Sequence, residues 1–147
     1  MNSLFLKIAL CLVAATCNAQ NVAFHDCGSL LSTINEVAIL PCPNLPCKLL
    51  KGTNISVAIQ FTPNTAVTDA ETVVHGIIEG IPVAFPLPDD NACHFMSCPL
   101  AAGTAVTYVN VINVRPDYPT TNLIVKWEVT SSSGEVFCFT IPATITS

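Results

Sequence analysis

The sequence predicts an all-β protein, an antiparallel sandwich of about seven short strands. The first observation is alternation: in "NISVAIQF", the apolar residues Ile55, Val57 and Ile59 point one way and their neighbours point the other, as in a half-buried strand. The same pattern recurs in "NLIVKWEVT". Turn-forming Gly and Pro separate the apolar runs at "LKGTN", "TPNTA", "RPDYP" and "SSSGE". Short strands at this spacing are typical of a β-sandwich.

Three further runs rich in β-branched residues complete the predicted strands: "ETVVHGIIE", "TAVTYVNVINV" and "EVFCFTIPATIT". Residues 29–38, "SLLSTINEVA", have mixed periodicity, so we expect irregular chain there that leads into a strand. The chain has no internal repeat, and its 147 residues are enough for one domain with a substantial core.

Residues 80–88, "GIPVAFPLP", combine three prolines with a complete lack of charge. The prolines exclude a helix or a central strand, so we interpret the stretch as an edge segment on which no further strand can add. Four apolar side chains alternate onto one of its faces: Ile81, Val83, Phe85 and Leu87. That face either packs on a filled core or lines a cavity between splayed sheets, and the pattern alone favours packing.

The first 19 residues have the pattern of a secretory signal peptide, with Lys7 before an apolar run and a small residue at Ala19. The apolar run is shorter than the roughly 20 residues that a membrane-spanning helix requires. We therefore predict a signal peptide at residues 1–19 and one domain at residues 20–147. The mature protein is expected to be secreted and extracellular, with the lysosomal lumen as the alternative.

Of the eight cysteines, Cys11 and Cys17 fall in the signal peptide. An even number remains, which in a secreted chain indicates disulfides rather than a zinc site. Composition leaves their connectivity open. The equal spacing within "CPNLPC" and "CHFMSC" favours two local clamps, which would leave Cys27 and Cys138 to join the two ends of the domain.

Charge is scarce, with five basic and ten acidic residues and a net charge of −5. Phosphate binding requires clustered Lys and Arg, so the composition argues against a nucleic-acid partner. For the same reason we expect at most transient contact with an anionic membrane or a membrane receptor. Hydrophobic residues make up 51% of the chain, and a large core is the default explanation.

Several motifs stand in a fixed order over residues 22–145: "FHDCGS", "PCPNLPCKLLKG", "VVHGIIEGIPVAFPLP", "DYPTTNLIVKWEV" and "FCFTIP". In these motifs the chain resembles the ML lipid-recognition domain family, in particular its Niemann-Pick type C soluble sterol-binding members and their arthropod relatives. The resemblance implies an immunoglobulin-like sandwich with an apolar cavity between its sheets. It also implies three disulfides: Cys27–Cys138, Cys42–Cys47 and Cys93–Cys98.

The resemblance further implies a carrier for a hydrophobic small molecule: a sterol, a long-chain fatty acid or a semiochemical. It places Phe85, Val114 and Tyr118 at the pocket mouth and Trp127 on the pocket wall. Three neighbours complete the expected lipid-binding set: Val83, Pro119 and Phe139. We expect a monomer that needs no cofactor and no metal ion.

Three alternatives are weaker. An enzyme is not expected, because the chain has neither a G-x-S-x-G elbow nor an H-E-x-x-H motif. Immune recognition of bacterial lipopolysaccharide would require several cations at the mouth, where only Arg115 is available. Lysosomal sterol transfer to a membrane partner is disfavoured because Glu79 interrupts the apolar loop that would make the contact.

Two further signals are less specific. The "NIS" sequence at Asn54 is a glycosylation sequon, which a secreted chain exposes to the modifying enzymes. Three histidines are candidates for sensing acidity, although such residues are more often structural: His25, His75 and His94.

Overall fold

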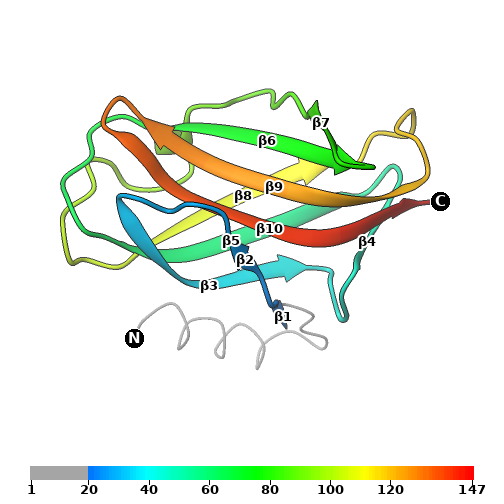
Figure 1. Ribbon diagram of the computed structural model, residues 1–147, viewed down its shortest axis with the longest axis horizontal. Coiled ribbons are helices and arrows are strands. Elements are labelled where there is room, and N and C mark those ends of the chain that lie inside the picture. Colours follow the sequence, from blue (N-terminus) through cyan, green and yellow to red (C-terminus); the bar gives the residue numbers. More distant parts are fainter. Residues whose placement is uncertain (1–19) are drawn as a thin grey trace.

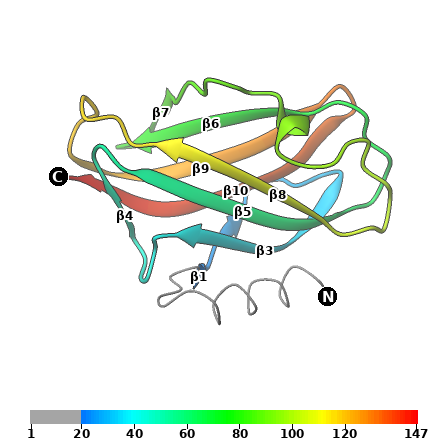
Figure 2. The same cartoon turned by 180° about the vertical axis from the view of Figure 1, so that it is seen from behind.

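Two β-sheets packed face to face form the structure (Figures 1 and 2), a computed structural model that describes residues 20–147. The predicted signal peptide, residues 1–19, lies outside the described residues. The strands are β1 (Gln20–Asn21), β2 (His25–Asp26), β3 (Ser32–Leu40), β4 (Cys47–Leu50), β5 (Asn54–Pro63), β6 (Glu71–Ile78), β7 (Ile81–Ala84), β8 (Val106–Asn113), β9 (Thr121–Ser131) and β10 (Gly134–Thr146). One short 3₁₀ helix, η1, covers Ala92–His94.

One sheet has the strand order β1-β3-β5-β8 and the other the order β2-β10-β9-β6-β7. Neighbours in both sheets are antiparallel, and β4 pairs with β10 in parallel. The predicted all-β sandwich is confirmed. Within residues 20–147, no helix is long and apolar enough to cross a membrane.

The prediction of irregular chain at residues 29–38 is wrong, because β3 already begins at Ser32. The register between β3 and β5 shifts between Ile34 and Glu36, which marks a β-bulge. A bulge inserts one extra residue, so the side chains that follow it change face and the alternation changes phase. The mixed periodicity of this stretch is therefore a bulged strand.

Aromatic rings fill much of the space between the sheets. Phe61 lies 5.0 Å from Phe137 between ring centroids, and Tyr108 lies 6.1 Å from both Phe137 and Trp127. Trp127 in turn stacks on Phe139 at 6.5 Å with an interplanar angle of 9°. These five rings are all buried and join the inner faces of both sheets.

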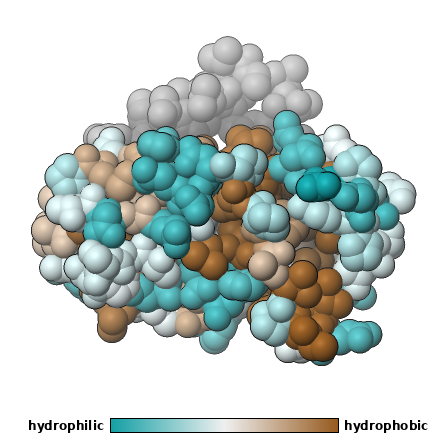
Figure 3. Space-filling model, turned by 90° about the horizontal axis from the view of Figure 1, so that it is seen from above, coloured by the Kyte–Doolittle hydropathy of each residue, from teal (hydrophilic) through white to brown (hydrophobic). Residues whose placement is uncertain are grey.

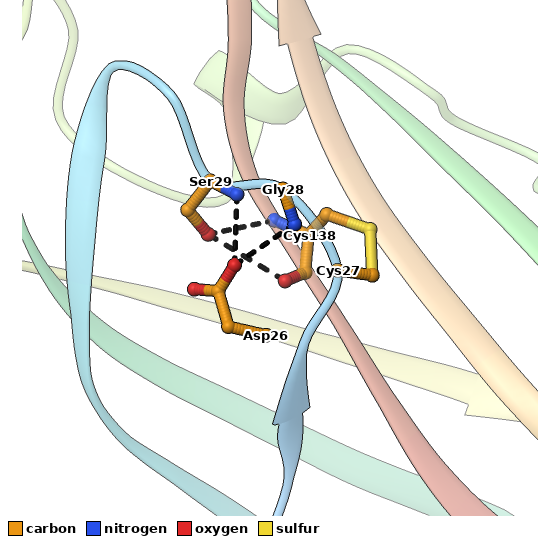
Figure 4. Close-up of a disulfide and its surroundings, with 5 residues drawn as sticks. All are labelled: Asp26, Cys27, Gly28, Ser29 and Cys138. Atoms are coloured by element: carbon orange, nitrogen blue, oxygen red, sulfur yellow. Dashed lines mark hydrogen bonds between the residues drawn. A yellow bond between two sulfur atoms is a disulfide. The ribbon is translucent and has the colours of Figure 1, made fainter.

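The three expected disulfides are confirmed, and Cys27–Cys138 fixes the N-terminal segment to β10 across 111 positions of sequence. Figure 4 shows how the neighbouring turn is held: the Asp26 carboxylate accepts hydrogen bonds from the Gly28 and Ser29 amides at 2.9 and 2.8 Å. Partial burial raises the pKa of Asp26, but the hydrogen bonds from Ser29 and Gly28 outweigh it and leave the pKa below its usual range.

The edge position predicted for "GIPVAFPLP" is confirmed, because β7 is the last strand of its sheet. The Phe85 amide donates to the Val74 carbonyl at 2.9 Å, so its N–H points toward β6. Backbone N–H groups alternate in direction along a strand, which turns the amide positions of Pro82, Ala84 and Pro86 toward the open edge. Two of these three positions are proline and have no N–H to offer another strand.

Replacing Pro82 by Ala should restore one outward N–H and promote edge-to-edge pairing between molecules. We expect a concentration-dependent shift toward dimers in analytical ultracentrifugation. Ala84→Pro is the matched control, since it removes the remaining outward N–H of β7 and should not increase association. Equal association of the two variants would contradict this role of the prolines.

Candidate lipid-binding site

A groove of about 630 Å³ opens where the segment after β7 approaches the edge strand β8 of the opposite sheet. Its apolar wall comprises Phe85, Pro86, Leu87, Pro88, Ile112 and Tyr118. Asn54, Asn113 and Arg115 form a polar rim. Figure 3, which looks onto this edge of the sandwich, shows apolar surface set among polar residues. A concave apolar surface with a few polar groups is the usual form of a small-molecule site.

Two aromatic rings from different elements meet in this groove. Phe85, just after β7, and Tyr118, in the loop before β9, have ring centroids 4.8 Å apart and are both half-buried. Backbone hydrogen bonds hold both positions: Phe85 donates to Val74, and Tyr118 donates to the Arg115 carbonyl at 3.1 Å. The pair therefore forms a fixed aromatic part of the groove wall.

Val114 is fully buried and belongs to the core against which Phe85 and Tyr118 pack. Its amide donates to the Thr53 carbonyl at 2.8 Å, and its carbonyl accepts from the Gly52 amide at 2.6 Å. These two bonds fix the end of β8 to the turn before β5. Of the residues predicted for the mouth, the structure thus brings Phe85 and Tyr118 into the groove and places Val114 in the core that supports it.

The cation at the rim is already paired. Arg115 donates to both carboxylate oxygens of Asp117, at 3.0 and 2.9 Å, and its guanidinium lies 5.9 Å from the Tyr118 ring centroid. The hydrogen bond and charge of Asp117 raise the pKa of Arg115 above its usual range. Burial is the main cause of the raised pKa of Tyr118. The groove rim therefore offers no free cluster of positive charge to a phosphate.

Val83 belongs to the inner face of its sheet and yet is 48% exposed. It pairs with Gly76, whose neighbours Val74 and Ile78 carry the inward side chains of β6. An inner-face residue stays exposed only if the opposite sheet does not cover it, so β7 overhangs β8 at this edge. The β6–β7 turn is formed by Glu79 and Gly80, both with positive φ (52° and 80°), as a type I′ turn requires.

The other three predicted residues lie outside the groove. Trp127 and Phe139 stack on each other in the core, and Pro119 is exposed beside Tyr118. One strand, β6, separates Trp127 from Phe85, because Val74 of β6 pairs with Trp127 and accepts from the Phe85 amide. Sequence reasoning missed Ile112, which lines the groove. The alternation in "TAVTYVNVINV" could have identified it, since Ile112 shares a face with Tyr108.

A second groove, of about 500 Å³, lies at the ends of β6, β9 and β10. Ile77, Ile124 and Pro142 contribute apolar surface there. These three residues are paired across β6, β9 and β10 and share the outer face of that sheet. The lining of this groove also includes the core residues Leu123 and Ala143. Within residues 20–147, no group of three His, Cys, Asp or Glu side chains is arranged to hold a metal ion.

A carboxyl pair lies on the same outer face. Burial, and then the hydrogen bond and charge of Glu128, raise the pKa of Glu135 to about 8, against a usual value of 4.5. Between these two values the folded protein holds a proton that the unfolded chain has lost. Stability should therefore fall as pH rises through this window. Because the Glu135 carboxyl is only partly shielded from solvent, we expect a loss of about 1 kcal/mol.

Glu135→Gln should flatten this pH dependence, since the amide does not titrate. The measurement is chemical unfolding of both proteins at several pH values from about 5 to about 8. Glu71→Gln, at an exposed carboxyl, is the matched control and should keep the wild-type slope. Parallel curves for wild type and Glu135→Gln would show that this pair has no such effect.

Comparison with known proteins agrees with this architecture. A family model described as the ML domain matches residues 21–145. NPC intracellular cholesterol transporter 2 of Bos taurus is 41% identical over 142 residues, which cover 94% of this chain and 95% of that protein. The ecdysteroid-regulated 16 kDa protein of Manduca sexta is 35% identical over 132 residues, covering 87% and 91%.

Among solved structures, a Niemann-Pick type C2 protein from the Japanese carpenter ant superposes with a TM-score of 0.80 at 26% identity. The match covers 85% of this chain and 100% of that one. The family model spans nearly all of the described sandwich, and the relatives match over most of their own length. The chain belongs to the ML domain family.

Proposed function

We propose that the protein is a carrier that binds one hydrophobic molecule, a sterol or a long-chain fatty acid or semiochemical, between its sheets behind Phe85 and Tyr118. The observation that carries this proposal is the apolar groove at the open edge of the sandwich, where the inner face of β7 stays uncovered. The names of the relatives, which include cholesterol transporters, support the same ligand class.

Binding of this kind would depend on burial of apolar surface. Covering roughly 400 Å² of lipid at about 25 cal/mol per Å² corresponds to about 10 kcal/mol before association costs. Those costs bring the expected dissociation constant into the micromolar to high-nanomolar range. An apolar groove distinguishes length and shape better than single methylene groups, so we expect moderate selectivity.

The groove rim and the named relatives also bear on two alternative functions, a lipopolysaccharide receptor and an enzyme. The pairing of Arg115 with Asp117 disfavours a lipopolysaccharide receptor, which would have to present free cations at the mouth. We propose a carrier that is not an enzyme, in keeping with relatives named as transporters. We further propose a monomer that acts outside the cell, with the lysosomal lumen as the alternative location.

Asn54 is exposed at the rim of the groove, and its side-chain carbonyl accepts from Asn113 at 3.0 Å. We propose that this sequon is glycosylated during secretion. A carbohydrate chain there would stand beside the mouth. The mass of secreted protein before and after enzymatic deglycosylation, with Ser56→Ala as the control, tests this site.

The function is tested by native mass spectrometry of protein secreted from eukaryotic cells, followed by competition between a fluorescent sterol and a fluorescent fatty acid. One lipid per protein, displaced by one of the two probes, is the expected result and identifies the ligand class. Protein that captures no lipid and binds neither probe would refute the proposed function.

A further inference from the structure

A buried polar cluster lies between the sheets. The Tyr108 hydroxyl on β8 lies 2.8 Å from the Thr72 hydroxyl on β6 and accepts a hydrogen bond from the Asn110 amide at 2.9 Å. Thr72, Tyr108 and Asn110 are 3%, 0% and 6% exposed. The hydrogen bonds therefore connect the two sheets inside an otherwise apolar interior.

The cluster contains N–H groups that have no hydrogen-bond acceptor. Trp127 is 1% exposed, and its buried indole N–H reaches hydrogen-bonding geometry with no acceptor in residues 20–147, although the Tyr108 hydroxyl is close enough for the indole to oppose the burial that raises the pKa of Tyr108. The side-chain amide of Asn110 has two N–H groups, and one of them donates to Tyr108. The side-chain carbonyl of Asn110 already accepts from the Val111 amide at 2.7 Å. A buried donor without an acceptor is costly, so it marks a place where an acceptor would be bound.

The cluster shares a strand face with one residue of the groove wall. Every second side chain of β8 points inward. Along the strand, Ile112 in the groove wall is therefore followed on the inner face by Asn110 and then by Tyr108. In the other sheet, Trp127 pairs with Val74, whose carbonyl holds the Phe85 amide. A molecule that entered along these faces past Phe85 and Ile112 would reach Asn110 and, beyond Val74, Trp127.

We propose that this cluster is a recognition subsite for a neutral oxygen acceptor at the buried end of the lipid, such as a carbonyl, ether or hydroxyl oxygen. The inference rests on the proposed function, because the lipid reaches the cluster only through the groove. The unpaired N–H groups of Trp127 and Asn110 would donate to that oxygen. A plain hydrocarbon would leave them unpaired.

A carboxylate fits this subsite poorly. None of the four cluster side chains is cationic, and the one charge that acts on Tyr108, that of Asp89, is negative. A buried carboxylate without a cation is strongly disfavoured. The subsite therefore selects lipids whose leading end carries a neutral oxygen, and it directs any acid group toward the solvent.

The test compares two probes of equal length, a long-chain methyl ketone and the n-alkane with the same number of heavy atoms, by displacement of a fluorescent sterol. Wild type should bind the ketone about tenfold more tightly. Trp127→Phe keeps an aromatic ring and removes the N–H, so the preference should largely vanish while the alkane still binds. Thr130→Val, on the outer face of β9, is the matched control and should keep the preference.

Asn110→Leu gives a second variant at the same subsite, which keeps the test valid if Trp127→Phe is poorly folded by circular dichroism. A ketone preference unchanged in both variants, or absent from wild type, would overturn the subsite while leaving the carrier function intact. Failure of wild type to bind the sterol and both probes would instead overturn the proposed function, and the subsite with it.

Discussion

Replacing Cys27 and Cys138 together by serine should lower the free energy of unfolding by about 4–5 kcal/mol. The reason is the size of the loop that this disulfide closes, because the two cysteines are 111 positions apart. A long cross-link removes much of the conformational freedom of the unfolded chain. Guanidinium unfolding without reductant measures the loss.

The Cys93→Ser and Cys98→Ser double variant is the comparison, since these half-buried cysteines are only five positions apart. Its expected loss is about 2 kcal/mol, because the closed loop is short. A larger loss for the short clamp than for Cys27–Cys138 would contradict this loop-length argument.

Phe85→Ala and Tyr118→Ala should each weaken lipid binding by about tenfold to a hundredfold. Either change removes an aromatic ring from the groove wall, and roughly 60–100 Å² of lost apolar contact corresponds to about 1.5–2.5 kcal/mol. The fold should be affected less, because both rings are only half-buried. Displacement of a fluorescent sterol measures binding, and thermal unfolding measures stability.

Val109→Ala is the matched control, since Val109 is an exposed apolar residue on the outer face of β8. It should leave sterol affinity close to that of wild type. If binding and thermal stability fell in equal proportion in Phe85→Ala and Tyr118→Ala, these rings would be packing residues and not part of a mouth.

The long strands could be predicted from the sequence because each presents one buried and one exposed face. β5 shows this alternation without interruption. β3 does not, since its bulge near Asn35 shifts the phase, and the sequence therefore predicts irregular chain where the strand has already begun. β1 and β2 have two residues each and are defined by pairing with distant strands, which periodicity does not report.

Part of the groove lining could be predicted. Proline placement located the edge at β7, and the family resemblance identified Phe85 and Tyr118, which do meet in the groove. Whether Val83 packs on a core or borders an opening depends on how far the opposite sheet extends, which no local pattern encodes. The cluster of Thr72, Tyr108 and Trp127 could not be predicted from a local pattern either, because its members come from three strands.

The central claim is that the lipid lies between the sheets, and Trp127 offers a direct measurement because it is the only tryptophan of the chain. Bromine quenches tryptophan fluorescence only at near contact, so we would titrate the protein with a brominated long-chain lipid. The account predicts loss of most of the emission, saturating at one lipid per protein. Binding of the same lipid, seen by native mass spectrometry, with unchanged Trp127 emission would place it elsewhere, for instance in the outer groove at Ile77 and Ile124, and would contradict the account.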